Sequence, residues 1–339
     1  GYNVSSEYYI NDAGKQIDNL ALSVNARYLE LLGKEVEFPE NGYHGQDIIE
    51  TAKRIIAKDG DKYLNMSDEE RLSIFKELAL KEKLAALKED LAAFNVHFDV
   101  WFSERTLHPD AVNAVCDKLL ANGNMYKQDG ALWLKSTAYG DDKDRVVIRD
   151  NGVPTYLAAD IAYHDNKFER KFDKLINIWG ADHHGYVCRV KAAMAALGYN
   201  ADDLEVLLLQ MVSLYRDGEL VKMSKRTGQS VTLSELIEEV GTDAARFFFV
   251  MRSIDSQLDF DLTLATEKSN ENPVYYIQYA HARICSIFRQ LKEAGIEELP
   301  KTDYTLLTDP AEIELIKKLG EYPELIASAA KERAVHRVA

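Results

Sequence analysis

Apolar residues recur with a helical spacing over the first third of the chain. Residues 18–32 and 46–94 show this spacing, and Ser67 followed by Glu70 forms a capping-box pattern at a helix start. One apolar face within the second stretch is marked by Leu84, Leu87 and Leu91. This part of the chain is therefore predicted to be mainly helical.

A turn is predicted close to the start of the chain. Asn11-Asp12 stands just before Gly14, and residues of these types favour turns and helix caps. We expect the turn to cap a helix that begins near Lys15. The residues themselves indicate no chemistry beyond this structural role.

Further along the chain, short apolar segments alternate with helical ones. The predicted order is a strand at 98–102, a helix at 111–122, short strands within 126–148, a helix at 156–164, a strand at 175–180, a helix at 186–197 and an apolar strand segment at 205–215. Gly198 is expected to end the helix before it, and Pro273 marks the border with a final helical region. Such alternation favours an α/β fold with a doubly wound, Rossmann-like parallel sheet.

The basic segment Lys222-Met223-Ser224-Lys225-Arg226 carries the strongest chemical signal in the sequence. It follows the hairpin-turn residues Asp217-Gly218 and precedes Thr232 and Glu235, a capping-box pair whose helix should end at Gly241. The segment is thus predicted to be a strand-to-helix loop beside a helix N-terminus, where anions bind. The ammonium groups of Lys222 and Lys225 suit a polyphosphate such as ATP. A solvated basic turn is the alternative.

A second polar turn, Gly180 to Gly185, follows the strand predicted at 175–180 and opens a helix. Ligands of doubly wound sheets sit at this edge, so nucleotide contact is predicted for the polar groups of the turn. The residues concerned are Gly180, Asp182, His183 and His184. The alternatives are a capping role for Asp182 and a zinc site, but adjacent histidines do not converge on one ion as i, i+4 pairs do.

Tyr156 and Asp160 stand four positions apart on a predicted helix and therefore share a face. A carboxylate beside a phenol can bind a guanidinium group through paired hydrogen bonds, with the ring as an aromatic wall. A second carboxylate would strengthen the selection for positive charge, and Glu104 is the candidate partner. A solvated helix surface is the alternative interpretation.

The composition is that of an ordinary soluble globular chain: 339 residues, 46% hydrophobic and 29% charged, a length that suggests about two domains. The formal net charge of −15 argues against a broadly basic nucleic-acid-binding surface, so RNA contacts would need local basic patches. Cys116, Cys188 and Cys285 show no metal-binding spacing, so we expect reduced thiols and no structural zinc. No apolar run of membrane-spanning length and no signal peptide is visible, which predicts a cytoplasmic location.

Taken together, these segments resemble one family. The basic loop resembles the lysine signature loop of class I aminoacyl-tRNA synthetases, with Arg226 where many members have serine. Five more segments are similar to arginyl-tRNA synthetase, in that family's order along the chain. They are 8–16 (YYINDAGKQ), 98–104 (FDVWFSE), 155–160 (TYLAAD), 179–186 (WGADHHGY) and 272–283 (NPVYYIQYAHAR).

The resemblance implies a division of the chain into four parts. Residues 1–24 would belong to the catalytic nucleotide-binding domain and residues 25–122 to a mainly helical connective insertion. Residues 123–265 would form the second half of the catalytic domain, including the lysine loop. Residues 266–339 would begin a helical anticodon-binding domain. An independent helical domain remains the alternative for the helical region.

The activity implied by the resemblance is ligation of arginine to tRNA(Arg). Arginine would be activated by ATP, accompanied by Mg²⁺, to arginyl-adenylate and then transferred, with activation itself requiring tRNA. Lys222 and Lys225 would act in catalysis, and Met223 and Ser224 would contact ATP with the turn 180–185. Glu104, Tyr156 and Asp160 would bind arginine. The expected partners are arginine and tRNA(Arg), without a membrane, and the protein is expected to be a monomer.

The family's other ATP signature, His-Ile/Val-Gly-His, occurs nowhere in the 339 residues. The chain opens without a methionine, in what reads as a strand in progress, and it ends in a helical region. We therefore expect a form truncated at both ends that is inactive alone. The alternatives are a non-catalytic synthetase-like module that binds arginine or tRNA, and another class I synthetase; one for cysteine would show zinc-binding cysteines.

Overall fold

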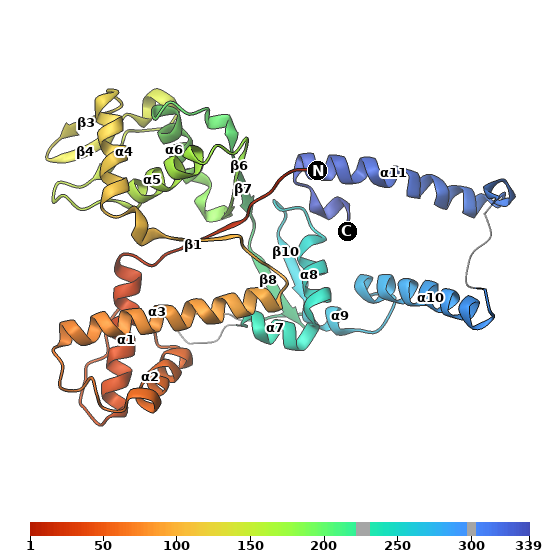
Figure 1. Ribbon diagram of the computed structural model, residues 1–339, viewed down its shortest axis with the longest axis horizontal. Helices are drawn as coiled ribbons and strands as arrows, with labels where there is room; N and C mark the ends of the chain where they lie inside the picture. The colour runs from red at the N-terminus through yellow and green to blue at the C-terminus, as the bar shows by residue number, and fades with distance from the viewer. Residues whose placement is uncertain (222–230, 297–302) are drawn as a thin grey trace. The chain divides into compact units, whose positions relative to one another are not determined.

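A computed structural model describes residues 1–221, 231–296 and 303–339 (Figure 1). The chain divides into two compact units, a first unit that contains Gly1–Leu208 and a second that contains Leu209–Val221 and Thr232–Ala339. The four-part division expected from the sequence stays a prediction. None of the described helices is both long and apolar enough to span a membrane.

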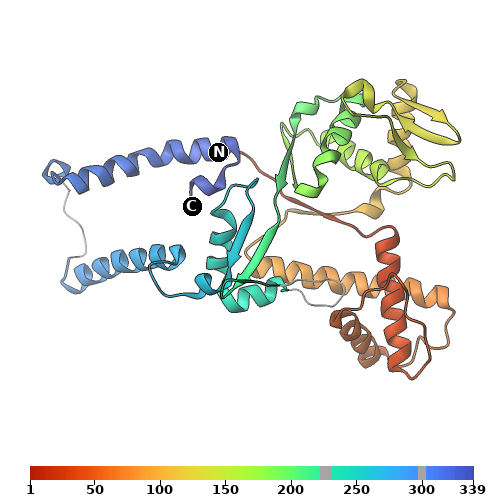
Figure 2. The ribbon, with the colours of Figure 1, turned by 180° about the vertical axis from the view of Figure 1, so that it is seen from behind.

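The first unit opens with a strand and three helices. Their bounds are β1 (Glu7–Ile10), α1 (Lys15–Leu31), α2 (Gln46–Asp59) and α3 (Asp68–Ala93). Helix α1 packs against both α2 and α3, and Figure 2 shows the three helices side by side. The predicted capping box of Ser67 and Glu70 is confirmed at the start of α3.

The core of this helical part lies between Tyr28, Tyr63 and Phe75, whose rings meet edge to face. Tyr28 is fully buried, and its hydroxyl donates to the carbonyl oxygen of Gly60 at 2.9 Å. The predicted apolar face of α3 at Leu84, Leu87 and Leu91 is only half-buried. Packing is therefore concentrated in the first half of α3.

One prediction for this region is wrong. Helix α1 begins at Lys15 as expected, but Gly14 is its N-cap and no side chain caps it. The side chain of Asp12 instead accepts hydrogen bonds from residues near position 104. A partner more than ninety positions away leaves no trace in the local pattern from which caps are predicted.

The rest of the first unit alternates strands and helices. The elements are β2 (Val100–Ser103), η1 (Glu104–Leu107), α4 (Asp110–Ala121), β3 (Met125–Gln128), β4 (Ala131–Leu134), η2 (Ser136–Tyr139), β5 (Arg145–Ile148), α5 (Tyr156–Glu169), β6 (Leu175–Gly180), η3 (Ala181–His183), α6 (His184–Ala196), η4 (Ala201–Asp203) and β7 (Leu204–Leu209). Strands β1 and β2 pair in parallel, β3, β4 and β5 form an antiparallel sheet, and β6 neighbours β7.

Helix α5 occupies the centre of this α/β part. It contacts α4, α6, β5 and η1, and eight of its fourteen residues are buried. Its small residues Ala158, Ala159 and Ala162 let these neighbours approach closely, while Ile161 fills the space between them. Burial of that many side chains fixes the helix against every element around it.

The second unit contains a small sheet followed by helices. Its elements are β8 (Val212–Arg216), β9 (Glu219–Leu220), α7 (Leu233–Val240), α8 (Thr242–Val250), β10 (Leu258–Asp261), α9 (Leu262–Thr266), α10 (Pro273–Glu293), η5 (Tyr304–Leu306), α11 (Pro310–Glu332) and η6 (Val335–Arg337). Strand β8 lies between β9 and β10, parallel to β10 and antiparallel to β9.

Local signals in the second unit predicted its turns well. Asp217 and Gly218 have φ angles of 52° and 80° and join β8 to β9, which confirms the hairpin. Thr232 and Glu235 form the predicted capping box, and α7 ends at Gly241, whose φ is 85°. Pro273 is the first residue of α10, one after its cap.

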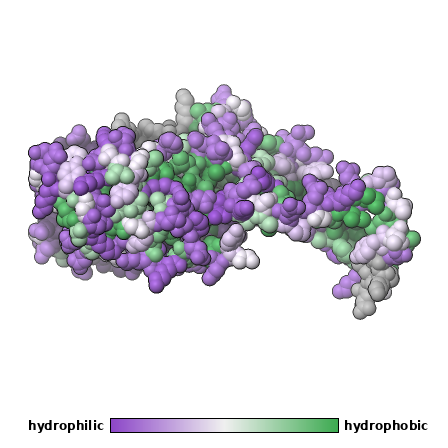
Figure 3. Space-filling model, turned by 90° about the horizontal axis from the view of Figure 1, so that it is seen from above, coloured by the Kyte–Doolittle hydropathy of each residue, from purple (hydrophilic) through white to green (hydrophobic). Residues whose placement is uncertain are grey.

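Helices α10 and α11 carry many exposed apolar side chains. Those of α10 include Ile284, Ile287 and Phe288. Figure 3 shows green hydrophobic residues interspersed among the purple hydrophilic ones on the face seen from above. The N-terminus of α10 is well anchored, because the buried Asn272 accepts from the backbone N–H groups of Val274 and Tyr275. Helix α10 therefore begins at a buried cap, although much of its apolar surface is exposed.

The α/β class is confirmed, while the predicted sheet is smaller than expected. The described strands form sheets of two or three strands. The apolar segment predicted at 205–215 is two strands, β7 and β8, which belong to different units. No glycine or proline marks the break at Gln210 and Met211, so the apolar pattern runs through it without a signal.

Replacing Phe75 with alanine should lower the free energy of unfolding of the helical part by about 3–5 kcal/mol, because the cavity left would be lined by rigid rings. Leu87→Ala, on the same helix but half-buried, is the matched control and should cost about 1 kcal/mol. Urea unfolding followed by circular dichroism, with hydrogen exchange of α1 to α3, compares them. Equal losses would show that the core lies elsewhere.

Candidate active site

The two candidate carboxylates come from different elements of the first unit. Glu104 begins η1 directly after β2, and Asp160 lies on the second turn of α5. Contact between η1 and α5 brings these elements together. The negative charge of Glu104 acts on Asp160, so the structure joins the two residues that the sequence proposed as partners. We refer to Glu104 and Asp160 as the carboxylate pair.

Asp160 is half-buried and bound by a tyrosine. The hydroxyl of Tyr186 on α6 donates to Asp160 Oδ2 at 2.5 Å. Burial, with a smaller contribution from the charge of Glu104, raises the pKa of Asp160 to about 6, although Tyr186 and His183 act to lower it. The group therefore exchanges its proton close to physiological pH.

Glu104 is also largely enclosed, with 12% of its side chain exposed. Burial raises its pKa, and the nearby charge of Asp12 adds to this effect. His108 opposes it, with Nε2 lying 3.6 Å from Glu104 Oε1, and so does a hydrogen bond with the hydroxyl of Tyr9. Burial therefore makes the ionised form of each carboxylate unfavourable, and a bound cation would offset this effect.

Aromatic rings surround this pair. The ring of Tyr9 on β1 lies 4.6 Å from that of Tyr163 and stacks on Phe102 at 6.1 Å, centroid to centroid. Trp179 lies 5.9 Å from Tyr186. Burial raises the pKa values of Tyr9 and Tyr186, so both remain neutral phenols that can donate hydrogen bonds. The carboxylates are therefore surrounded by aromatic rings, and two of these rings carry hydroxyl groups that can donate hydrogen bonds.

Tyr156 is not among these rings. It is the first residue of α5, 75% exposed, and it takes part in none of the hydrogen bonds or ring contacts recorded for the described residues. Helical periodicity places it on the face of Asp160, although its neighbours Leu157, Ala158 and Ala159 in the same turn are buried. The phenols beside the carboxylates come from Tyr9 and Tyr186, in segments that already carried the family resemblance, and the predicted arginine contact of Tyr156 stays a prediction.

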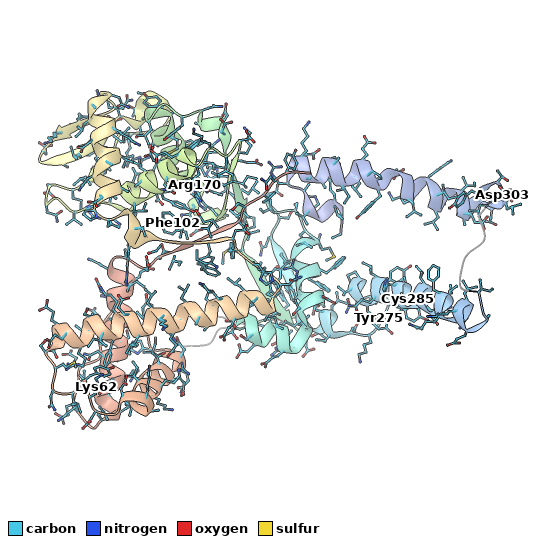
Figure 4. All side chains as sticks on the ribbon, viewed as in Figure 1. Lys62, Phe102, Arg170, Tyr275, Cys285 and Asp303 are labelled. Carbon is cyan, nitrogen blue, oxygen red and sulfur yellow. The ribbon has the colours of Figure 1, made fainter. Side chains whose placement is uncertain are left out.

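A cluster around Glu7 ties the far end of α5 to β1. Arg170 binds the Glu7 carboxylate with both terminal nitrogens, at 2.7 and 3.0 Å, and the hydroxyl of Tyr163 donates to it at 2.5 Å. Figure 4 marks Arg170 beyond the end of α5 and Phe102 on β2. These contacts lower the pKa of Glu7 despite its burial. The cluster is suited to holding the helix in register with the strand.

A second, directional network ties α5 to β6. Lys167 can only donate, so Asn177 Oδ1 accepts from it at 2.7 Å, and the Asn177 amide group then donates to His164 Nε2 at 2.7 Å. His164 Nδ1 must therefore carry the proton and donate to the carbonyl oxygen of Asp160, also at 2.7 Å. Burial lowers the pKa of His164 to about 4 and that of Lys167 to about 8. The histidine is a neutral structural link beneath Asp160.

The predicted nucleotide turn is exposed. Strand β6 ends at Gly180, η3 follows, and α6 begins at His184. A Cβ added to Gly180 would meet only the mobile end of the Asp182 side chain, so the contacts do not explain the glycine there. The side chain of Asp182 is 82% exposed and caps neither η3 nor α6, so the capping interpretation is wrong.

The predicted roles of the basic segment and the expected absence of a structural zinc site both stay predictions. Lys222, Met223, Ser224 and Lys225 lie outside the described residues, so their predicted roles remain predictions. Within the described part of the chain, no three His, Cys, Asp or Glu side chains are grouped so that they could hold a metal ion. The arrangement that the structure does build is a pair of acidic groups beside phenol donors, which suits a flat, multiply donating cation.

Comparison with known proteins finds matching families for most of the chain. The family of "tRNA synthetases class I (R), catalytic domain" matches residues 1–253, and the "DALR anticodon binding domain" matches residues 277–339. The arginine–tRNA ligase 1 of Halalkalibacterium halodurans is 56% identical over 339 residues, and that of Carboxydothermus hydrogenoformans 57% over 342 residues. Both matches cover 100% of this chain and 61% of the relative, so the chain spans about three-fifths of these proteins.

Solved structures agree with the sequence matches. A Campylobacter jejuni protein assigned as an arginyl-tRNA synthetase has a TM-score of 0.90 at 38% identity, covering 100% of this chain and 74% of that one. The Thermus thermophilus arginyl-tRNA synthetase has a TM-score of 0.74 at 22% identity, covering 99% and 65%, and shows likeness of fold alone. The chain therefore belongs to the arginyl-tRNA synthetase family of the class I aminoacyl-tRNA synthetases.

Proposed function

We propose that this chain is part of an arginine–tRNA ligase, which activates arginine with ATP and transfers it to tRNA(Arg). The observation that supports this most directly is the carboxylate pair, Glu104 and Asp160, beside the phenols of Tyr9 and Tyr186. Among amino acid side chains, guanidinium alone presents a rigid, planar set of five donors to such a pair. The match of residues 277–339 to an anticodon-binding family supports tRNA as the second substrate.

Discrimination against related amino acids follows from the same groups. Citrulline offers a neutral urea, which cannot neutralise two carboxylates whose burial already disfavours their charge. Lysine brings a charge but only a compact ammonium, which cannot match a fork of two acceptors. Canavanine keeps the fork and should be the strongest competitor.

In the proposed reaction, the arginine carboxylate attacks the α-phosphate of ATP in line and pyrophosphate leaves. The terminal ribose hydroxyl of the tRNA then attacks the carbonyl of arginyl-adenylate, and AMP leaves. Lys222 and Lys225 stabilise the negative charge that develops on the transferring phosphoryl group and pyrophosphate. Met223 and Ser224 contact ATP, together with Gly180, Asp182, His183 and His184 at the exposed turn after β6.

Mg²⁺ is proposed to accompany ATP, held mostly by phosphate and water oxygens. The described residues contain no cluster of three ligating side chains, so we assign the ion no step. We further propose that the small parallel sheets belong to a doubly wound nucleotide fold, and that the protein acts as a cytoplasmic monomer. Because the sequence has no His-x-Gly-His motif, residues 1–339 alone are proposed to bind arginine without completing its activation.

The full-length product of the gene that encodes this chain should charge unfractionated tRNA with arginine and with no other standard amino acid. Residues 1–339, tested in parallel, should bind arginine in calorimetry but charge no tRNA. Charging with a different amino acid, or with none, would defeat the proposal and favour a binding module. Arginine-dependent ATP–pyrophosphate exchange by residues 1–339 with tRNA present would defeat only the claim of inactivity.

Arginine binding should weaken as the pH falls through about 6, the value to which burial raises the pKa of Asp160. Protonation removes the acceptor, so affinity should fall up to about tenfold per pH unit below that value. Asp160→Asn should weaken binding at pH 7.5 by about 10- to 100-fold and flatten the profile. Its melting temperature should not fall, because the raised pKa means that the charged carboxylate destabilises the fold at neutral pH.

Calorimetric titrations of the 339-residue chain between pH 5 and 8 measure this profile. Glu104 and His183 face Asp160 and could also contribute, so Glu104→Gln and His183→Gln are titrated alongside. A profile that is unchanged in Asp160→Asn, but flat in His183→Gln, would contradict the role given to Asp160.

Lys225→Ala in the full-length product should lower kcat by about 100-fold while leaving the Kd for arginine within about twofold. The lysine is proposed to act on charge that develops during the reaction and to make no contact with the arginine side chain. Arg226→Ser, a residue that many family members carry there, is the matched control and should retain most of the turnover. Pre-steady-state charging and equilibrium binding separate the two quantities, and equal losses in both would contradict the catalytic role.

A further inference from the structure

Asp12 is a nearly buried carboxylate for which the proposed reaction has no use. It is 7% exposed and lies in the turn that follows β1. The turn holds itself with a bond from the Asp12 N–H to the carbonyl oxygen of Ile10 at 2.9 Å, and the Asp12 side chain does not cap α1. A carboxylate that is removed from water in this way needs hydrogen bonds of its own.

Asp12 finds these partners on both sides of Glu104. The hydroxyl of Ser103 donates to Asp12 Oδ2 at 2.5 Å, and the backbone N–H of Arg105 donates to Asp12 Oδ1 at 3.1 Å. The carbonyl oxygen of Asp12 accepts from Arg105 Nε at 2.7 Å. The residues before and after Glu104 are thus bound to one turn by three hydrogen bonds.

We call these hydrogen bonds of Asp12 with Ser103 and Arg105 the clamp. The clamp also reaches a third element. Arg105 Nη1 donates to Glu77 Oε1 on α3 at 2.7 Å, while its Nε remains on Asp12. The point where β2 becomes η1 is therefore held from β1 and from α3 at once. Glu104 cannot move at this point without loosening bonds on either side of it.

Asp12 also acts on Glu104 through its charge. The negative charge of Asp12 raises the pKa of Glu104, in the same direction as burial does. His108, directly after η1, and Tyr9 on β1 oppose this shift, and Asp160 on α5 interacts with Glu104 through its charge. An additional buried negative charge favours any ligand that brings a positive one.

We propose that Asp12 is a positioning residue for arginine recognition: it holds Glu104 in place by binding the residues on each side of it, without touching the substrate. The inference rests on the proposed function, because it assumes that Glu104 faces the guanidinium group. It gives the NDAGKQ segment a role in the site that its sequence did not indicate.

A double-mutant cycle on the 339-residue chain tests this inference, with the Kd for arginine measured by calorimetry at pH 7.5. Asp12→Ala and Glu104→Gln should each weaken binding by about tenfold or more. In the Glu104→Gln background, Asp12→Ala should weaken binding by less than about twofold, because the residue acts through Glu104. Selectivity for arginine over citrulline should fall in both single variants.

Two further variants separate positioning from general stability. Asp12→Asn and Ser103→Ala each remove part of the clamp and keep the test open if Asp12→Ala does not fold. Asp99→Asn is the matched control, because Asp99 binds Ser6 at the other end of the same strand pair, at 2.7 and 3.0 Å. It should change the melting temperature but leave the Kd for arginine within about twofold.

The outcomes distinguish this inference from the proposed function. If the unmodified chain binds no arginine, the proposed function fails and this inference fails with it. If it binds arginine, the inference alone fails in three cases: when Glu104→Gln has no effect, when the Asp12 variants bind normally, or when the effects of Asp12→Ala and Glu104→Gln add in full. An equal loss of affinity in Asp99→Asn would reduce Asp12 to a structural role and overturn the inference as well.

Discussion

The burial of helix α5 is the constraint on which the rest of the first unit depends. More than half of its residues are buried, and its neighbours include α4, α6, β5 and η1. A helix enclosed in this way leaves little water around any polar side chain that it carries inward. The raised pKa of Asp160 and the lowered pKa of His164 are both consequences of that enclosure.

Cations and carboxylates gather at the C-terminal end of α5, where Lys118 also binds Asp165 and Glu169. Asp160 lies on the second turn, whereas Lys167 and Arg170 lie at the end of the helix, where the negative end of the helix dipole favours cations. Glu7 neutralises that cationic end, and no comparable cation faces Asp160 except the exposed His183 among its recorded charge partners. The ion pairs thus gather at one end of the helix, whereas Asp160, nearer the other end, is held by the hydrogen bond from Tyr186.

Features whose interacting residues are close in sequence could be predicted, whereas contacts between residues far apart in sequence could not. The capping boxes at Ser67 and Thr232 and the turn at Asp217-Gly218 were predicted correctly, because each is specified by residues within four positions. The pairing of Glu104 with Asp160 was proposed from the chemistry of guanidinium binding and supported by the family resemblance, since periodicity does not connect two separate elements. The role of Asp12 was misjudged, because its partners lie more than ninety residues away.

Tyr156 shows a different limit of sequence patterns. Helical spacing correctly places it one turn before Asp160, yet spacing does not say which neighbouring element covers that face of the helix. The phenol beside Asp160 belongs to Tyr186, twenty-six positions later, and reaches it because α6 packs against α5. Periodicity along one helix therefore cannot reveal a phenol that a neighbouring element supplies, and the predicted role of Tyr156 stays a prediction.

The energetics of the carboxylate pair bear directly on selectivity. Two acidic groups with raised pKa values are unfavourable as neighbours, and the surrounding rings of Tyr9, Tyr163 and Phe102 offer no compensating charge. A neutral ligand that filled the same space would leave this repulsion in place, whereas a guanidinium group would remove it and use both acceptors. Selection for arginine would then come as much from the penalty imposed on neutral competitors as from the contacts made with arginine itself.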